Sequence, residues 1–272
     1  IQANYDYTSE AEAADIVRTA LLVSPIVSAI FANSPYRAGQ DTGMQTFRGV
    51  AWTKTDPDRT GWPRFMYGED WGYEEYLDYV LDVPMFFIRR EGRLIPMVGT
   101  TFREYLDGES GMYEPNMSDF VLHLSTAFPE IRLKQFIEVR GADGGPRSHM
   151  TALPAIWKGI LYHEPSRERA AALLAGIEPS EHAELFMDVY RDGLKARAPG
   201  GTVQELAAEL LDYAGEGLEA LAEEFDHASE QAYLAPLRRI VEDGETLADQ
   251  LRADLEEHGD DWRPVLEKWS LM

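Results

Sequence analysis

The sequence IEVRGADGGP, residues 137–146, is the most informative stretch of this chain, because a strand with a charged face runs directly into a glycine-rich loop. From residue 131 onward, apolar and polar side chains alternate with a period of two, which is typical of a β-strand. One side of the predicted strand carries Ile131, Leu133, Ile137 and Val139. The other side carries Arg132, Lys134, Phe136, Glu138 and Arg140, and Gln135 is the exception to the pattern.

The polar side of this predicted strand suits a site for a metal ion and a phosphate. Three cations and one carboxylate occur within nine residues of a chain whose net charge is −23. We expect Glu138 to hold a divalent metal and Arg140 to reach the phosphate that the metal neutralises. A solvated sheet face is the alternative interpretation of the same alternation. The loop 141–145 is either a phosphate cradle or a tight turn, and a lone glycine-rich turn favours the second.

The composition describes an acidic globular chain of 272 residues. A hydrophobic content of 44% allows a sizeable core, built as one large domain or two small ones. The net charge argues against nucleic acid or an anionic membrane as a partner. The absence of cysteine excludes disulfides, thiolate catalysis and cysteine-ligated zinc. We expect no apolar stretch of membrane-spanning length, no signal peptide before the first strand, and a cytoplasmic location.

The N-terminal region predicts a strand followed by a long helix. In residues 1–7 the polar side chains of Gln2, Asn4 and Asp6 alternate with apolar ones, although solvent exposure alone explains such a face. Ser9-Glu10-Ala11-Glu12 is a capping box that opens a long helix. Pro25 lies inside this helix and is expected to kink it or split it in two.

The remaining elements divide the chain into two parts. Residues 46–53 predict a strand that carries Arg48, and residues 84–90 and 93–98 predict a hairpin. Beyond residue 148 strand signals almost disappear, and Pro and Gly separate the predicted helices. Those helices are 149–161, 166–175, 179–197, 202–225, 229–241, 244–257 and 262–269. We therefore predict an α+β part at residues 1–147 and a helical part at residues 148–272, packed as one unit.

A long resemblance adds to this interpretation. The run HLSTAFPEIRLKQFIEVRGADGGPRSHMTALPAIWKGILY resembles the plant and proteobacterial type of glutamate–cysteine ligase. Similar segments follow the family's order, namely IQANYDYTSE, SPIVSAIFANSPYRAG, TFRGVAWTKTDPDRTG and EEYLDYVLDVPMFF upstream and LADQLRADLEEHGDDWRPVLEKW downstream. The resemblance covers the whole chain but not the family's beginning. The chain therefore looks like the C-terminal portion of a larger enzyme that lacks the family's first strands.

The resemblance implies a fold and a reaction. Such enzymes resemble glutamine synthetase, with an antiparallel sheet curved around a metal–nucleotide site. ATP phosphorylates the γ-carboxylate of glutamate, and the amine of cysteine attacks the acyl phosphate to give γ-glutamylcysteine, the first step of glutathione biosynthesis. Phosphoryl transfer of this kind depends on positioning and on neutralising charge.

The resemblance also implies roles for individual residues. Gln2 and Glu138 are similar to Mg²⁺ ligands of the family, and Asn4 lies near the nucleotide. Arg140 resembles the residue that meets the transferred phosphate, and Lys134 shares its strand face, so we assign both to ATP binding. Arg48 resembles the arginine that binds the glutamate side of the reaction. We therefore predict Arg48 and Arg140 as the catalytic residues.

Two departures from the family concern the predicted substrate pocket. After the Pro-Met of DVPM, which ends at Met85, the family has Tyr and this chain has Phe86; after GGP the family has Trp and this chain has Arg147. A guanidinium in place of an aromatic wall favours an acceptor with additional negative charge. A related carboxylate–amine ligase with another acceptor is therefore an alternative to a cysteine ligase, and an inactive fragment is another.

Three expectations follow from the missing strands and the predicted metal site. Gln2 and Glu138 alone under-ligate Mg²⁺, so the isolated chain should lack ligase activity. Residues 1–7 and 132–140 should lie in one antiparallel sheet, with Gln2 and Glu138 on one face. The open sheet edge is expected to be completed by a second chain, by a symmetric contact between copies of this one, or by a separate N-terminal fragment of the same enzyme, which is the first choice.

Overall fold

The computed structural model describes residues 1–108 and 113–270, and helices make up most of it. The α-helices are α1 (Glu10–Ile30), α2 (Phe47–Trp52), α3 (Tyr73–Asp82), α4 (Phe102–Leu106), α5 (Met117–Leu124), α6 (Arg147–Leu161), α7 (Glu164–Ala172), α8 (Pro179–Asp192), α9 (Val203–Glu224), α10 (Ala235–Asp243), α11 (Leu247–Glu257) and α12 (Trp262–Lys268). The 3-10 helices are η1 (Arg64–Tyr67), η2 (Gly193–Lys195) and η3 (Gln231–Leu234). The strands are β1 (Ala3–Tyr5), β2 (Tyr36–Arg37), β3 (Gln40–Asp41), β4 (Thr60–Gly61), β5 (Phe87–Arg90), β6 (Arg93–Pro96), β7 (Phe128–Pro129), β8 (Ile131–Leu133), β9 (Ile137–Val139), β10 (Arg197–Ala198) and β11 (Gly201–Thr202).

The central sheet is small and antiparallel, with the strand order β1-β9-β8. This arrangement confirms the prediction that the first strand and the strand ending at residue 139 lie in one antiparallel sheet. It also corrects the prediction of a single strand through residues 131–140, because β8 and β9 form a hairpin. The three residues between them turn the chain, and the Lys134 amide donates to the Phe136 carbonyl over 2.9 Å.

The hairpin preserves the predicted faces. Its register pairs Arg132 with Glu138 and Leu133 with Ile137, so residues of equal parity stay on one side of the sheet. Gln135, the exception in the alternation, lies exposed in the turn. The alternation was therefore correct about the faces although one strand proved to be two.

Helix α1 is the central core element. The Ser9 side chain accepts from the Glu12 amide, as expected for the predicted cap, and the helix continues without a break past Pro25. Every residue from Thr19 to Ile30 is buried, so packing outweighs the hydrogen bond that proline removes. The prediction of a split is wrong, because one helix spans both sides of Pro25, and the kink stays a prediction.

The prediction that no apolar stretch reaches membrane-spanning length is wrong for helix α1. Its 21 residues are long and apolar enough to cross a membrane by length and composition. In the structure, however, 89% of its most apolar window is buried inside the protein, as in the core helix of a soluble domain.

The predicted strand at residues 46–53 is instead helix α2. The Thr46 side chain accepts a hydrogen bond from the Gly49 amide at 3.3 Å, which starts the helix. Arg48 therefore lies in the first turn of a helix. The predicted hairpin is confirmed by the antiparallel pair β5 and β6.

The C-terminal helices were predicted largely correctly, with two differences. The stretch predicted as one helix at 179–197 ends with η2 and β10, and η3 replaces the start of the helix predicted at 229–241. Helix α5 was not predicted. Helices α6 and α9 pack so closely that a Cβ atom on Gly159 would lie 2.1 Å from the Ala214 carbonyl oxygen.

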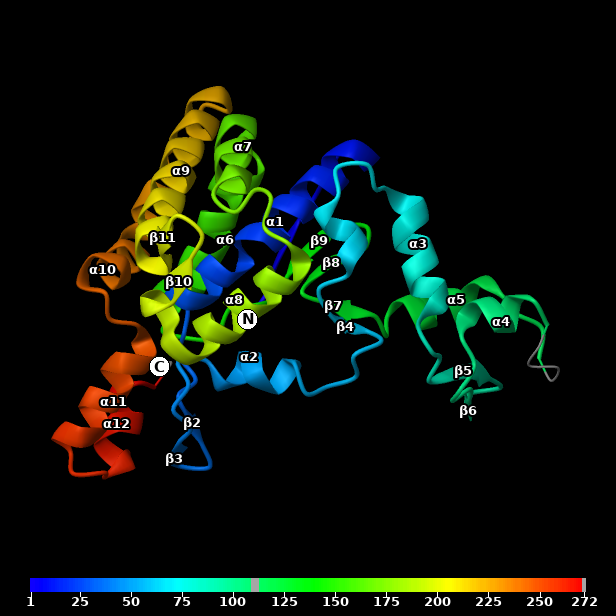
Figure 1. The fold of residues 1–272 in the computed structure, drawn as a ribbon, viewed down its shortest axis with the longest axis horizontal. Helices are drawn as coiled ribbons and strands as arrows, with labels where there is room; N and C mark the ends of the chain where they lie inside the picture. The colour runs from blue at the N-terminus through cyan, green and yellow to red at the C-terminus, as the bar shows by residue number, and fades with distance from the viewer. Residues whose placement is uncertain (109–112, 271–272) are drawn as a thin grey trace.

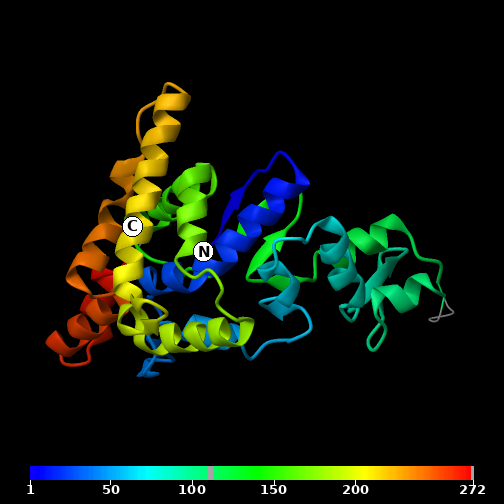
Figure 2. The same cartoon turned by 45° about the horizontal axis from the view of Figure 1, so that its top comes forward.

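The overall shape has a helical mass at one end and a smaller lobe at the other (Figure 1). Helices α6 and α9–α12 lie together at one side, and a rotated view keeps the lobe of α3–α5, β5 and β6 apart from them (Figure 2). The lobe has its own cluster of buried side chains, namely Met85, Ile88, Met97, Phe102 and Tyr105. The main core combines residues from both predicted parts, including Ile16, Ile137 and Leu210. The α+β class is confirmed; the boundary at residue 147 stays a prediction, and residues 271–272 of the second part lie outside the described residues.

Candidate functional site

The polar face of the central sheet gathers several of the predicted site residues. Antiparallel pairing of β1 with β9 places Asn4 directly opposite Glu138. Gln2 precedes β1 by one residue and is exposed, and the strand alternation puts it on the same side as Asn4. The sheet therefore presents Gln2, Asn4 and Glu138 on one face.

Glu138 lies in a cluster of three cations. Its carboxylate oxygens lie 3.3 Å from Arg132 Nη1, 3.5 Å from Lys134 Nζ and 3.2 Å from Arg140 Nη1. Arg132 is held there by the cross-strand register, while Lys134 lies at the start of the turn. We refer to Arg132, Lys134, Glu138 and Arg140 as the cationic cluster.

The cationic cluster keeps Glu138 ionised. Burial acts to raise the pKa of Glu138, but the charges of Arg132, Lys134 and Arg140 outweigh it and hold the pKa below its usual range. The formal charge of the cluster is +2, since three cations surround one carboxylate. Because the whole chain carries −23, this face is an exception on an acidic molecule and suits an anionic ligand such as a phosphate.

Two aromatic rings flank the Arg140 guanidinium. Its Cζ atom lies 5.5 Å from the centre of the Trp52 ring and 5.4 Å from that of Phe128. Contacts of this kind are favourable cation–π interactions, and they fix the side chain in place. Arg140 is therefore pre-positioned on the face that carries Glu138.

Arg48 supports the backbone that follows β9. Its guanidinium donates to the Arg140 carbonyl over 2.7 Å and to the Gly141 carbonyl over 2.9 Å. The predicted contact of Arg48 with glutamate stays a prediction, but the structure gives this side chain a positioning role. It connects the start of α2 to the glycine-rich loop.

The glycine-rich loop is anchored from inside by Asp143. This buried carboxylate accepts hydrogen bonds from the Asn33 amide at 2.9 Å, from Ser34 Oγ at 2.7 Å and from Thr46 Oγ1 at 3.0 Å. Burial raises the pKa of Asp143 despite these hydrogen bonds and the nearby Arg48 charge. The loop is thus an anchored turn that connects residues 33–34 and the cap of α2 to the end of β9.

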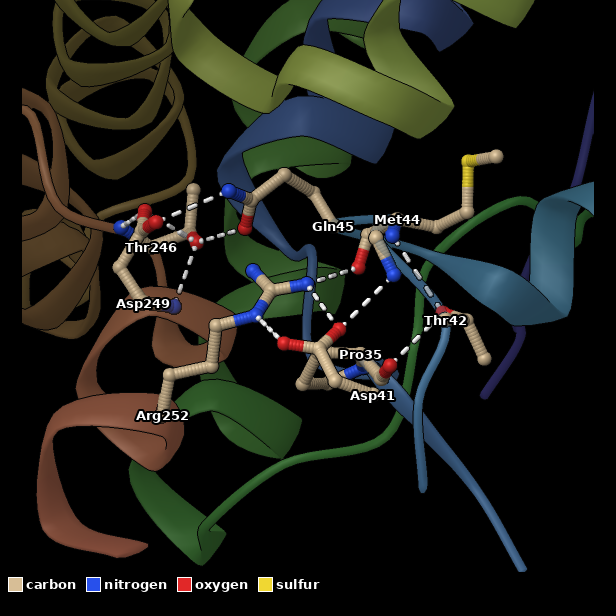
Figure 3. Close-up of polar contacts among 9 residues, drawn as sticks. Pro35, Asp41, Thr42, Met44, Gln45, Thr246, Asp249 and Arg252 are labelled. Carbon is tan, nitrogen blue, oxygen red and sulfur yellow. Dashed lines mark hydrogen bonds and ion pairs between the residues drawn. The ribbon is translucent and has the colours of Figure 1, made fainter. Parts of the chain in front are cut away.

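A second polar network ties the segment before α2 to the C-terminal helices (Figure 3). Arg252 of α11 donates to both carboxylate oxygens of Asp41, over 2.8 and 3.0 Å, and to the Met44 carbonyl over 2.7 Å. The buried Gln45 donates to Asp249 and accepts from Thr246 Oγ1 over 2.8 and 2.9 Å. The C-terminal part therefore holds the loop from which α2 and Arg48 start.

The three residues predicted to line the substrate pocket lie elsewhere. Met85 is buried in the lobe, and Phe86 is exposed with the Arg59 guanidinium 3.6 Å from its ring centre. Arg147 is exposed at the start of α6. In the part of the chain that the structure describes, none of these residues joins the cationic cluster, and their substrate contacts stay predictions.

A cavity of about 520 Å³ opens beside Arg140, and the sequence analysis did not predict it. Its lining includes Trp62, Tyr79, Glu130 and Tyr190, which come from four separate segments. Glu130 was the one available signal, because it immediately precedes the alternating stretch and its even position places it with the polar side chains of that stretch. The aromatic members carry no short-range pattern that distinguishes them from core residues.

The described residues do not form a metal site by themselves. Across residues 1–108 and 113–270, no group of three or more His, Cys, Asp or Glu side chains is arranged to hold a metal ion. On the sheet face, Gln2 and Asn4 offer amide oxygens, and Glu138 offers a carboxylate opposite Asn4. Mg²⁺ prefers several oxygen ligands with negative charge, so this set fits the ion only if further acidic ligands are added.

Sequence comparison places this chain in a ligase family. Residues 1–268 match Glutamate-cysteine ligase family 2 (GCS2), and the chain belongs to that family. The match extends over both the sheet and the helical part.

Curated relatives support the same assignment. The chain is 39% identical over 254 residues to "Glutamate--cysteine ligase, chloroplastic" of Medicago truncatula, covering 92% of this chain and 49% of that protein. It is 38% identical over 275 residues to the protein of the same name in Arabidopsis thaliana, covering 98% of this chain and 51% of the relative. The chain thus spans about half the length of the curated relatives that it matches.

The relatives correct the predicted location. Both are named as chloroplastic enzymes, as is "Glutamate--cysteine ligase B, chloroplastic" of Oryza sativa subsp. japonica, which is 37% identical. The prediction of a cytoplasmic protein is therefore wrong. It rested on composition and on the absence of cysteine, which do not distinguish one reducing compartment from another.

Proposed function

We propose that this chain is part of an ATP-dependent ligase that joins the γ-carboxylate of glutamate to the amine of cysteine through a γ-glutamyl phosphate. Family membership supports the reaction class. The cationic cluster is the observation that carries the proposal, because it places three cations on one sheet face of an otherwise acidic chain. Such a face binds the phosphates of ATP and the anionic intermediate.

The residues have distinct parts in this proposal. Arg140 neutralises the transferred phosphoryl group, and Lys134 together with Asn4 contacts the nucleotide. Arg48 holds the Arg140 backbone and, in the proposed complex, binds glutamate. Mg²⁺, when bound, neutralises phosphate charge, with Gln2 and Glu138 among its ligands and the acidic ligands supplied by another segment. The glutamine-synthetase-like curvature of the complete sheet is part of the same proposal.

The outer edge of β1 is the proposed attachment point for that other segment. Among the described strands, β1 pairs only with β9, so its other edge offers free backbone donors and acceptors. The relatives are about twice as long as this chain. We propose that a polypeptide corresponding to their remaining half adds strands at this edge. Native mass spectrometry of the purified protein tests this, and a monomer of this chain alone that is active would contradict it.

The function is tested by measuring ADP release from the complete gene product with glutamate, ATP and a panel of primary amines. The proposal expects glutamate-dependent turnover with cysteine. Preference for a more acidic amine would favour the alternative acceptor suggested by Phe86 and Arg147. No turnover with any amine would refute the proposal, and the isolated chain serves as the comparison.

A further inference from the structure

A closed hydrogen-bond network connects the start of α2 to the glycine-rich loop, and Asp143 is at its centre. The Asp143 carboxylate accepts from the Thr46 and Ser34 hydroxyls over 3.0 and 2.7 Å. The Thr46 oxygen accepts in turn from the Gly49 amide over 3.3 Å, which lies in the first turn of α2. The Ser34 oxygen accepts from the Arg48 amide over 3.0 Å. The network closes because the Arg48 guanidinium donates to two backbone carbonyls that precede Asp143 in the loop.

The network requires an acceptor with two oxygens at position 143. A hydroxyl carries one proton, and here the protons of Ser34 and Thr46 are directed at the carboxylate, which leaves the oxygen lone pairs for the α2 amides. An asparagine side chain would place N–H groups against one of the two hydroxyls, and that hydroxyl would lose the acceptor for its proton. The substitution would also remove the negative charge that strengthens every hydrogen bond to the carboxylate.

Burial makes the network sensitive to such a change. The Asp143 side chain is 3% exposed, and its third hydrogen bond comes from the Asn33 amide over 2.9 Å. Burial raises the pKa of Asp143, while the three donated hydrogen bonds and the charge of Arg48 oppose the rise. Water has little access to replace a lost partner at this depth. The carboxylate therefore holds the first turn of α2 in one place relative to the loop.

The segment before α2 is fixed on its other side, so it does not shift freely to compensate. The amides of Gln45 and Thr46 both donate to the Tyr190 carbonyl, over 2.9 and 3.1 Å. The Gln45 side chain is held by Thr246 and Asp249 of α11 (Figure 3). With the preceding residues anchored in this way, the contacts to Asp143 determine where the first turn of α2 directs its side chains.

Arg48 is the side chain in that turn whose direction matters for the proposed reaction. A guanidinium has five N–H groups, and Arg48 uses its two Nη atoms to reach the loop carbonyls. The side chain is only partly buried, so further N–H groups remain for a ligand. A guanidinium recognises a carboxylate through two parallel hydrogen bonds, which depend on a precise position. A small movement of α2 would therefore weaken the binding of a carboxylate ligand without changing the charge of the site.

We propose that Asp143 is a positioning residue for glutamate, because it holds the first turn of α2 so that Arg48 meets a carboxylate of that substrate. This inference rests on the proposed function, in which Arg48 binds glutamate. Asp143 acts through the two hydroxyls and does not touch the substrate. The nucleotide side depends on Arg140, whose side chain is held by Glu138 and two aromatic rings and not by Asp143. Glutamate binding should thus depend on Asp143 far more than ATP binding does.

Steady-state kinetics of the complete gene product with Asp143→Asn test this inference. The KM for glutamate should rise about tenfold or more, whereas the KM for ATP should stay within about twofold of the wild-type value. Asp119→Asn is the matched control, because Asp119 is an equally buried carboxylate that pairs with Arg90 in the lobe, and it should leave both KM values unchanged. An unchanged KM for glutamate in Asp143→Asn, or an equal rise in both KM values, would overturn the inference.

Thr46 offers a second test that does not depend on how well Asp143→Asn folds. Thr46→Val keeps the shape of the side chain but removes the hydroxyl, so the KM for glutamate should rise about fivefold or more. Thr46→Ser keeps the hydroxyl and should keep the wild-type KM. Equal KM values for these two variants would overturn the inference, and this pair decides alone if Asp143→Asn does not fold. An inactive wild type would refute the proposed function, whereas an active wild type with unaffected variants would refute this inference alone.

Discussion

Acidification is expected to destabilise the fold through His182, a fully buried residue of α8. Its Nε2 atom lies 3.0 Å from the Leu22 carbonyl oxygen of α1, and its Nδ1 atom lies 2.7 Å from the Tyr67 hydroxyl. Because a carbonyl only accepts, Nε2 carries the proton and Nδ1 accepts from the hydroxyl. The neutral ring therefore satisfies both nitrogens, and a second proton would place a charge on a fully buried group.

The magnitude follows from the pKa. Burial lowers the pKa of His182 to about 4 from its ordinary value of 6.5, while its hydrogen bond to Leu22 opposes the fall. The unfolded chain thus binds more protons between these two values, so stability is fully present above pH 6.5 and is lost as the pH falls toward 4. At ~1.4 kcal/mol per pH unit, His182 alone costs about 2 kcal/mol at pH 5.

Urea unfolding at pH 7 and pH 5 measures this contribution. His182→Gln should lower stability at pH 7 but should lose about 2 kcal/mol less than the wild type between the two pH values. His227→Gln is the matched control, because His227 is exposed and its removal should leave the pH dependence unchanged. If His182→Gln loses as much stability on acidification as the wild type, the buried neutral imidazole is not the cause.

Three further predictions concern packing and the site. Gly159→Ala should destabilise the fold by roughly 2–3 kcal/mol in denaturant titrations, because the new Cβ would overlap the Ala214 carbonyl. Gly144→Ala is the control and should change stability little, because a Cβ there would have no atom within 4 Å. Equal effects of the two substitutions would contradict the close crossing of α6 and α9. Arg48→Ala should lower the free energy of unfolding by about 2–4 kcal/mol, because two charged hydrogen bonds to loop carbonyls are lost. Arg93 is exposed, so Arg93→Ala should leave the free energy of unfolding unchanged in the same measurement. The chain alone should form no γ-glutamylcysteine in a direct product assay, and detectable product would show that its own residues complete the site.

Local sequence rules predicted the elements whose cause lies within a few residues. The side chain of Ser9 caps α1, and the hairpin β5–β6 forms where a short polar turn separates two apolar runs. The faces of β8 and β9 were also correct, because a hairpin that pairs residues of equal parity leaves alternation intact. The alternation did not reveal the turn between the strands, because the charged and aromatic residues of the turn continue the alternation on the polar side.

Tertiary contacts decided the elements that were predicted wrongly. TFRGVAWT has the composition of a strand, but the Thr46 cap and the packing of Gly49 against the Tyr190 ring make it helical. A Cβ atom at Gly49 would lie 2.4 Å from Tyr190, a contact between residues 141 positions apart. The cavity was missed for the same reason, because its lining comes together only after β7, α2 and α8 have packed.

Arg140 belongs both to the cationic cluster and to the lining of the neighbouring cavity. One side of its guanidinium pairs with Glu138 in the cationic cluster, and the same side chain lines the cavity that contains Glu130. Exposed charges on the rest of this acidic chain are screened beyond about 8 Å at physiological salt, so this local arrangement decides what binds here. In the proposed reaction, positive charge at this position stabilises the phosphate as it leaves.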